Sequence, residues 1–154
     1  MPKVQADGLP LPQRYGAILT IVIGISMAVL DGAIANVALP TIATDLHATP
    51  ASSIWVVNAY QIAIVISLLS FSFLGDMFGY RRIYKCGLVV FLLSSLFCAL
   101  SDSLQMLTLA RVIQGFGGAA LMSVNTALIR LIYPQRFLGR GMGMNSFIVA
   151  VSSA

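Results

Sequence analysis

Two ionisable residues lie inside stretches of this chain that are otherwise as apolar as the interior of a membrane. Asp31 lies within residues 15–39, and Arg111 lies within residues 104–132. Placing either charge at the centre of a membrane-spanning helix costs about 2.5 to 3.5 kcal/mol. An ionisable group at this depth therefore indicates a functional site. An aspartate can exchange a proton at accessible pH, whereas an arginine remains charged and favours the ionised form of a carboxylate beside it.

The composition of the whole chain is that of an integral membrane protein. Apolar residues make up 58% of the 154 residues and charged residues 9%, and the mean hydropathy is +0.92. Ordinary soluble domains contain roughly 25% charged residues. The net charge of +4 is spread over short clusters between apolar runs, which indicates contact with the cytoplasmic leaflet of the membrane and no nucleic acid partner.

The chemistry of soluble enzymes is poorly represented in the chain. It contains a single histidine and no glutamate, so a metal site or an acid/base pair of the soluble type is not expected. The glycines of residues 115–118 are not followed by the Lys-Ser or Lys-Thr of a phosphate-binding loop. We therefore expect no enzyme, no metal and no other cofactor.

Four apolar runs are long enough to cross about 30 Å of hydrocarbon, which takes about 20 helical residues. They are residues 15–39, 53–74, 83–100 and 104–132. Pro40 is expected to end the first run, and an N-cap is expected within residues 50–53. No segment has the ten-residue alternation of a transmembrane barrel. The sequence predicts an all-α, polytopic transmembrane helical bundle.

A fifth apolar run opens at Gly141 and stops at Ala154 after 14 residues, about 21 Å of helix. This length is too short to cross the membrane. We interpret residues 141–154 as an incomplete fifth span, and residues 15–154 as part of a larger N-terminal bundle. The alternative is a natural four-helix protein with a short amphipathic tail.

The basic residues between the runs define an orientation. Eight of the nine lie on one side of the four runs, and the ninth is Arg111. The connections at residues 40–52 and 101–103 contain no Lys or Arg. Because basic loops face the cytoplasm, residues 1–14 are expected to form a cytoplasmic N-terminal segment.

This orientation allows the depths of the two charges to be compared. Asp31 lies eight residues, about 12 Å, before the outer end of its run, and Arg111 lies seven residues, about 10 Å, after the outer start of its own. If the two helices are neighbours, an ion pair or a shared water-filled cavity explains how both charges are tolerated. The alternative to a functional role is a pair that only holds two helices together.

Three sequence motifs surround these charges. Residues 30–40 are LDGAIANVALP, residues 75–82 are GDMFGYRR, and residues 107–119 contain Arg111, Gln114 and three glycines. Their order and spacing resemble the motifs of the 14-spanning drug:proton antiporter family of the major facilitator superfamily. The departures from that family's pattern are Ala33, Ser72, Met77 and Tyr80, which replace a usual threonine, a glycine and two basic residues.

The resemblance implies the N-terminal part of a proton-coupled multidrug exporter in the bacterial inner (plasma) membrane. Asp31 would be the proton site and Arg111 its electrostatic modulator, and transport would proceed by alternating access against a C-terminal bundle outside this chain. The partners would be membrane lipid, the proton and a small amphipathic substrate. Alternatives are a metabolite exporter or symporter of the same fold, or an incomplete chain bound by insertion machinery or a chaperone.

The motif of residues 75–82 also has a physical interpretation of its own. Asp76 ends one helix, Gly79 permits a tight turn, and Arg81 places a cation beside the next helix. The resemblance implies that Asp76 and Arg81 act as a latch that holds the cytoplasmic side closed. A short charged turn that only enforces topology is the alternative.

Uncharged polar residues and glycines complete the set of candidates within the spans. Facing lipid would leave amide groups unsatisfied, so most of them should face the bundle interior, where they line a cavity or link helices. The polar candidates are Asn36, Asn58, Gln61, Gln114 and Asn125. Gly115 and Gly118 are expected to let a neighbouring helix approach closely. Tyr60 is expected to anchor its helix at the outer membrane interface.

Overall fold

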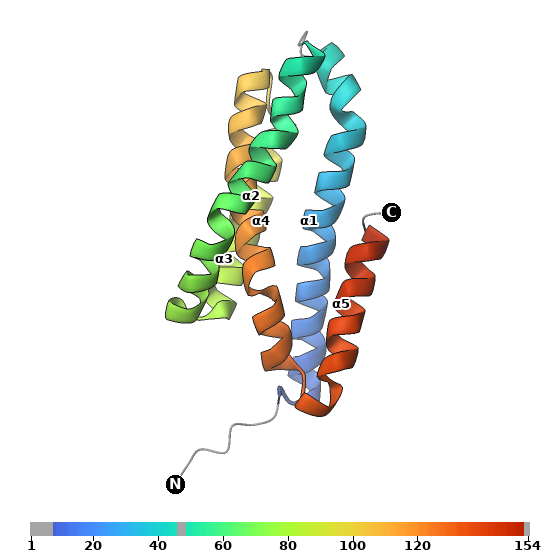
Figure 1. Cartoon of the computed structure of the whole chain (residues 1–154), viewed down its shortest axis with the longest axis vertical. Helices are drawn as coiled ribbons and strands as arrows, with labels where there is room; N and C mark the ends of the chain where they lie inside the picture. The colour runs from blue at the N-terminus through green and yellow to red at the C-terminus, as the bar shows by residue number, and fades with distance from the viewer. Residues whose placement is uncertain (1–7, 46–48, 153–154) are drawn as a thin grey trace.

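A computed structural model describes residues 8–45 and 49–152 of the chain, and these residues form helices and no strands. The elements are α1 (Leu11–Asp45), α2 (Pro50–Phe78), α3 (Tyr80–Ala99), α4 (Leu104–Ile132), η1 (Gln135–Phe137) and α5 (Leu138–Ser152). Helices α1 to α4 are each long and apolar enough to cross a membrane. The predicted all-α membrane fold is therefore confirmed (Figure 1).

Proline does not mark the first two boundaries as expected. Helix α1 continues through Pro40 to Asp45, because a proline removes one helical hydrogen bond without preventing the following residues from continuing the helix. Helix α2 begins at Pro50 and uses Thr49 as its N-cap, whose side-chain oxygen accepts a hydrogen bond from the Ser52 amide at 3.3 Å. Proline suits the first helical position because the amide there has no helical partner.

The later boundaries lie closer to the expectation. Helix α4 begins and ends at the residues of its apolar run, and the Ser103 side chain caps it by accepting a hydrogen bond from the Met106 amide at 3.3 Å. The fifth helix starts at Leu138, three residues before the expected Gly141, because η1 turns the chain directly into it. Gly79 joins α2 to α3 at a φ of +94°, a conformation that residues with a Cβ rarely adopt.

Helix α4 is the central element of the bundle. In α4, 61% of the most apolar window is buried, against 22 to 28% in the three other membrane-length helices. Its most extensive contacts are with α2 and α3, and Figure 1 shows it between that pair and α1. Residues carried by α4 are therefore the ones that this fold places between several helices.

Small residues set the close approach of α4 to its two main neighbours. A Cβ added to Gly115 would lie 2.7 Å from the Ala63 Cβ of α2. A Cβ added to Gly117 would lie 2.7 Å from the Phe91 backbone nitrogen of α3. Close backbone approach of this kind stabilises helix pairs in lipid, where the hydrophobic effect does not drive association. The packing role expected for Gly115 agrees with this geometry.

Candidate functional site

Asp31 of α1 and Arg111 of α4 lie in direct contact. The Arg111 Nη1 donates a hydrogen bond to the Asp31 Oδ2 at 2.5 Å, which is the one salt bridge within residues 8–45 and 49–152. The side chains are 9% and 19% exposed for Arg111 and Asp31. The pair is thus largely removed from solvent, while the carboxylate keeps a partly open side.

Gln114 closes a triangle with these two charges. Its Nε2 donates to the Asp31 Oδ1 at 3.0 Å, and its Oε1 accepts from the Arg111 Nη1 at 2.9 Å. It is 0% exposed. Gln114 follows Arg111 by three residues and so shares its helix face. Both carboxylate oxygens of Asp31 are therefore held by donors from one turn of α4.

Tyr60 of α2 forms the other side of the site. The Arg111 Cζ lies 5.6 Å from the centre of the Tyr60 ring, within the range of a cation–π interaction. The residue is 5% exposed, so the expectation that it anchors the helix at the membrane interface is wrong. Tyr60 lies seven residues, about 10 Å, after the outer start of the run at residues 53–74. Arg111 lies at the same depth in its own run, so the same count would have indicated that Tyr60 lies at the level of the site.

Two polar atoms of this site have no hydrogen-bond partner among the described residues. They are the Tyr60 hydroxyl oxygen and the Arg111 Nε, both buried. Cys98 of α3 approaches the same network, with its Sγ 3.6 Å from the Gln114 Oε1. Helices α1 to α4 each contribute a side chain to this site, although the Cys98 contact is long and weak.

The structure buries only some of the other polar candidates. Gly115, Gly118 and Asn125 are buried in α4 along with Gln114. Asn125 donates from Nδ2 to the Asn145 Oδ1 of α5 at 3.1 Å, a partner that the sequence analysis did not identify. Gly118 lies against Tyr60, because a Cβ added there would be 3.1 Å from the Tyr60 hydroxyl oxygen.

Asn36, Asn58 and Gln61 are exposed on the described bundle, so the expectation that most polar residues face its interior is wrong for these three. The rotation of α2 follows its buried stripe, with Val56, Tyr60 and Ala63 facing inward. Asn58 and Gln61 lie off that stripe. Close packing of α2 along this stripe therefore sets its rotation.

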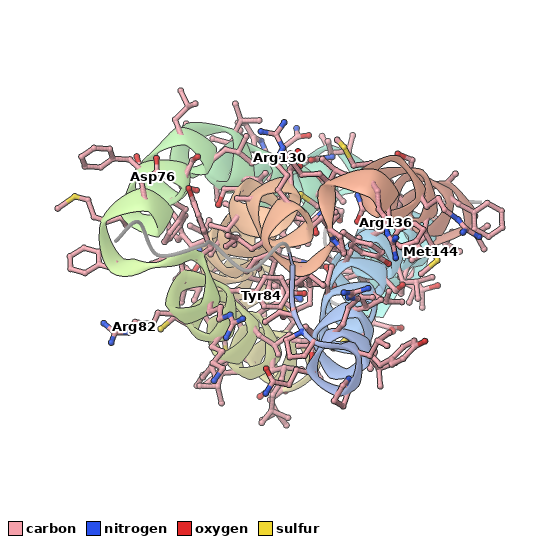
Figure 2. The ribbon with its side chains drawn as sticks, turned by 90° about the horizontal axis from the view of Figure 1, so that it is seen from below. Asp76, Arg82, Tyr84, Arg130, Arg136 and Met144 are labelled. Atoms are coloured by element: carbon pink, nitrogen blue, oxygen red, sulfur yellow. The ribbon has the colours of Figure 1, made fainter. Side chains whose placement is uncertain are left out.

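The loop between α2 and α3 differs from the expected charge network. The Tyr80 hydroxyl donates a hydrogen bond to the Asp76 Oδ1, and Asp76 forms no salt bridge with Arg81 within the described ranges. Both charged side chains are exposed. Figure 2 shows Asp76 at the end of α2 and Arg82 directed outward from α3. Tyr80, which replaces a usual basic residue, thus takes the contact with the carboxylate.

A bundle of membrane-length helices that closes around a buried acid and base is typical of a secondary transporter. The sequence model of the Major Facilitator Superfamily matches residues 21–154, and the chain belongs to this family of membrane transporters. The resemblance seen in the three motifs is therefore confirmed at the level of the superfamily.

Particular relatives extend this comparison. The chain is 99% identical over 154 residues to "Uncharacterized transporter YebQ" of Escherichia coli (strain K12). This alignment covers 100% of the chain and 34% of that protein. It is 32% identical over 143 residues to "Riboflavin transporter RibZ" of Clostridioides difficile (strain 630), covering 93% of the chain and 31% of that protein. The chain thus spans about a third of the length of these relatives.

A third relative is a named exporter. "Multidrug export protein EmrB" of Haemophilus influenzae (strain ATCC 51907 / DSM 11121 / KW20 / Rd) is 33% identical over 145 residues, covering 92% of the chain and 28% of that protein. Asp31 and Arg111 both lie within the 154 residues aligned to the Escherichia coli relative and within residues 21–154 matched by the family model. The site therefore lies within the part of the chain that these comparisons place in the family.

Proposed function

We propose that this chain belongs to a proton-coupled secondary transporter that exports amphipathic toxic compounds from the bacterial cytoplasm across the inner membrane. The observation that carries the proposal is the carboxylate of Asp31, held by Arg111 and Gln114 at membrane depth. A relative named as a multidrug export protein supports the substrate class. In this proposal, Asp31 is the proton site and Arg111 its electrostatic modulator.

The geometry gives the coupling step a physical basis. Ionised Asp31 accepts hydrogen bonds from two α4 side chains and so holds α1 against α4. Protonation of the carboxylate removes its charge and one of its acceptor positions, which weakens that contact. Loss of the proton restores it. A site with two such states can bias the rocking of this bundle against a second one, which lies outside this chain.

We place the proposed latch at the turn between α2 and α3. Gly79 supplies the positive φ that turns the chain sharply. Asp76 and Arg81 are both exposed and are not paired with each other within the described residues. Among the described residues no cation pairs with Asp76, so its carboxylate can contact a second bundle on this side of the membrane while it accepts the Tyr80 hydrogen bond.

The orientation predicts a labelling pattern for single cysteines, introduced after Cys86 and Cys98 have been replaced by serine. Asp102→Cys should react with a membrane-impermeant thiol reagent added outside the cell, and Gln135→Cys should not, because the basic loop residues lie on the side of Gln135. His47 lies in the connection of residues 40–52, which also lacks Lys and Arg and is expected on the outer side, but it falls outside the described residues. Labelling with the sides reversed would contradict a cytoplasmic N-terminus.

A metabolite exporter is a second candidate function. The specific observation in its favour is the 32% identity to a relative named as a riboflavin transporter. The acid and base of the site are compatible with either substrate, because the proton step does not depend on the chemistry of the cargo.

The proposal is tested by transport in liposomes that contain the full-length transporter of which this chain is a part. An imposed pH gradient should drive accumulation of an amphipathic cationic dye, and collapse of the gradient with an ionophore should stop it. Riboflavin is assayed in parallel under the same gradient. Riboflavin flux without dye flux would favour the second candidate. Flux of either compound that is unchanged when the pH gradient is collapsed would refute proton coupling.

A further inference from the structure

A cavity that is open to the surface lies between α1 and α3, on the side of the bundle that carries the basic loops. Its volume is about 430 Å³, within the usual size range of small-molecule sites. Figure 2 looks at this end of the molecule and shows Tyr84 between the two helices. The apolar part of the lining is formed by Leu9, Ala17, Ile21, Leu128 and Ile132.

Two cations of α3 line the same cavity. Arg81 and Lys85 are four residues apart and therefore project from one helix face. Both are exposed, and neither forms a salt bridge within the described residues. The other polar lining residues, Gln13, Thr20 and Tyr84, are uncharged, and none of the described residues that line the cavity is acidic. The described walls therefore provide no negative charge opposite the two cations.

The floor of the cavity is fixed by a contact between the two helices. The Tyr84 hydroxyl lies 3.2 Å from the Thr20 carbonyl oxygen and 3.3 Å from the Ile21 carbonyl oxygen, and donates to them. Tyr84 is 3% exposed. This contact therefore fixes the separation of α1 and α3 beside the cavity.

We propose that this cavity binds one anionic phospholipid of the cytoplasmic leaflet. The lipid phosphate would lie between Arg81 and Lys85, and an acyl chain would pack along the apolar wall of α1 and α4. A guanidinium binds phosphate oxygens in a bidentate manner, and an ammonium adds a point charge. Basic pockets between membrane helices on the cytoplasmic side are suited to acidic headgroups. This inference rests on the proposed orientation and not on the proposed substrate.

The charge requirement is tested with the full-length transporter in detergent, by counting retained lipids in native mass spectrometry. Phosphatidylglycerol should be retained about tenfold better than phosphatidylcholine with the same acyl chains, as expected when charge contributes to the site. Lys85→Gln should reduce this preference several-fold, and Arg81→Gln with Lys85→Gln should remove it. Arg82→Gln is the matched control, because this side chain points outward from α3 (Figure 2), and it should retain the preference.

The cavity itself is tested by filling it without changing any charge. Gly16 lines the cavity, and a Cβ added there would meet nothing within 4 Å. Gly16→Phe should therefore fold, as checked by size-exclusion chromatography, and should displace the lipid. Gly143→Phe in α5 is the control, since a Cβ added to Gly143 also meets nothing within 4 Å and Gly143 does not line this cavity.

Three results would overturn the proposal. Equal loss of lipid in Arg82→Gln and Lys85→Gln would indicate nonspecific attraction to surface charge. Retention of phosphatidylglycerol in folded Gly16→Phe would exclude the cavity as its position. Displacement of the lipid by an equal concentration of inorganic phosphate would indicate a small-anion site. None of these outcomes depends on proton-coupled flux, so the lipid site and the transport function can fail independently.

Discussion

Replacing Asp31 with asparagine should reduce pH-gradient-driven export by the full-length transporter to the level of protein-free liposomes. Asparagine keeps the shape of the side chain but cannot bind and release a proton. It also offers one oxygen where the carboxylate uses two, one toward Arg111 and one toward Gln114. Export is measured in liposomes, and substrate-induced proton release is measured from purified protein, each at equal folded amounts of wild type and variant.

Asp31→Glu is the matched comparison for this variant. Glutamate retains an ionisable carboxyl group and adds one methylene to the side chain. If Asp31 acts through its proton, this variant should release protons in response to substrate even if its rate is lower. Normal proton release by folded Asp31→Asn would refute the assignment of Asp31 as the proton site.

Replacing Arg111 is expected to have the next largest effect, and the two substitutions should differ. Arg111→Lys should impair transport less than Arg111→Ala, because lysine keeps a cation beside Asp31 but loses the planar fork. In the structure the Nη1 atom contacts both Asp31 and Gln114, and the guanidinium lies over the Tyr60 ring. A lysine ammonium can replace the charge without reproducing all three contacts.

The stability of the Arg111 variants gives an independent measurement. Removing one partner of a buried ion pair costs of order 3 to 5 kcal/mol in soluble proteins, because the other charge is left unpaired. Arg111→Ala should therefore lower the folded yield and the thermal midpoint, and Arg111→Lys should do so less. Both quantities are measured by size-exclusion chromatography and thermal unfolding of the detergent-purified protein.

A doubly neutral variant separates coupling from a purely structural ion pair. Asp31→Asn combined with Arg111→Gln removes both charges and so removes the penalty of an unpaired one. We expect it to recover folded yield relative to Asp31→Asn alone but to remain inactive in proton release. Full activity without either charge would show that the pair only holds α1 against α4.

The sequence by itself determined the class of the protein and the level of its site. Whether a segment enters a membrane as a helix depends on its own length and hydropathy, because every backbone group must be satisfied within the helix. Depth follows from a fixed rise per residue. Counting residues therefore placed Asp31 and Arg111 at one level before their helices were known to be neighbours, and the structure brings them to 2.5 Å.

Only the tertiary structure decided which side chains at that depth contact one another. Rotation of a helix about its axis depends on the surfaces of all its neighbours, and no local pattern in this chain contains that information. Tyr60 thus faces inward and contacts Arg111, whereas Asn58 and Gln61 of the same helix are exposed. Arg81 likewise lines the cavity between α1 and α3 instead of pairing with Asp76, because the packing of α3 against α4 and α2 sets its direction.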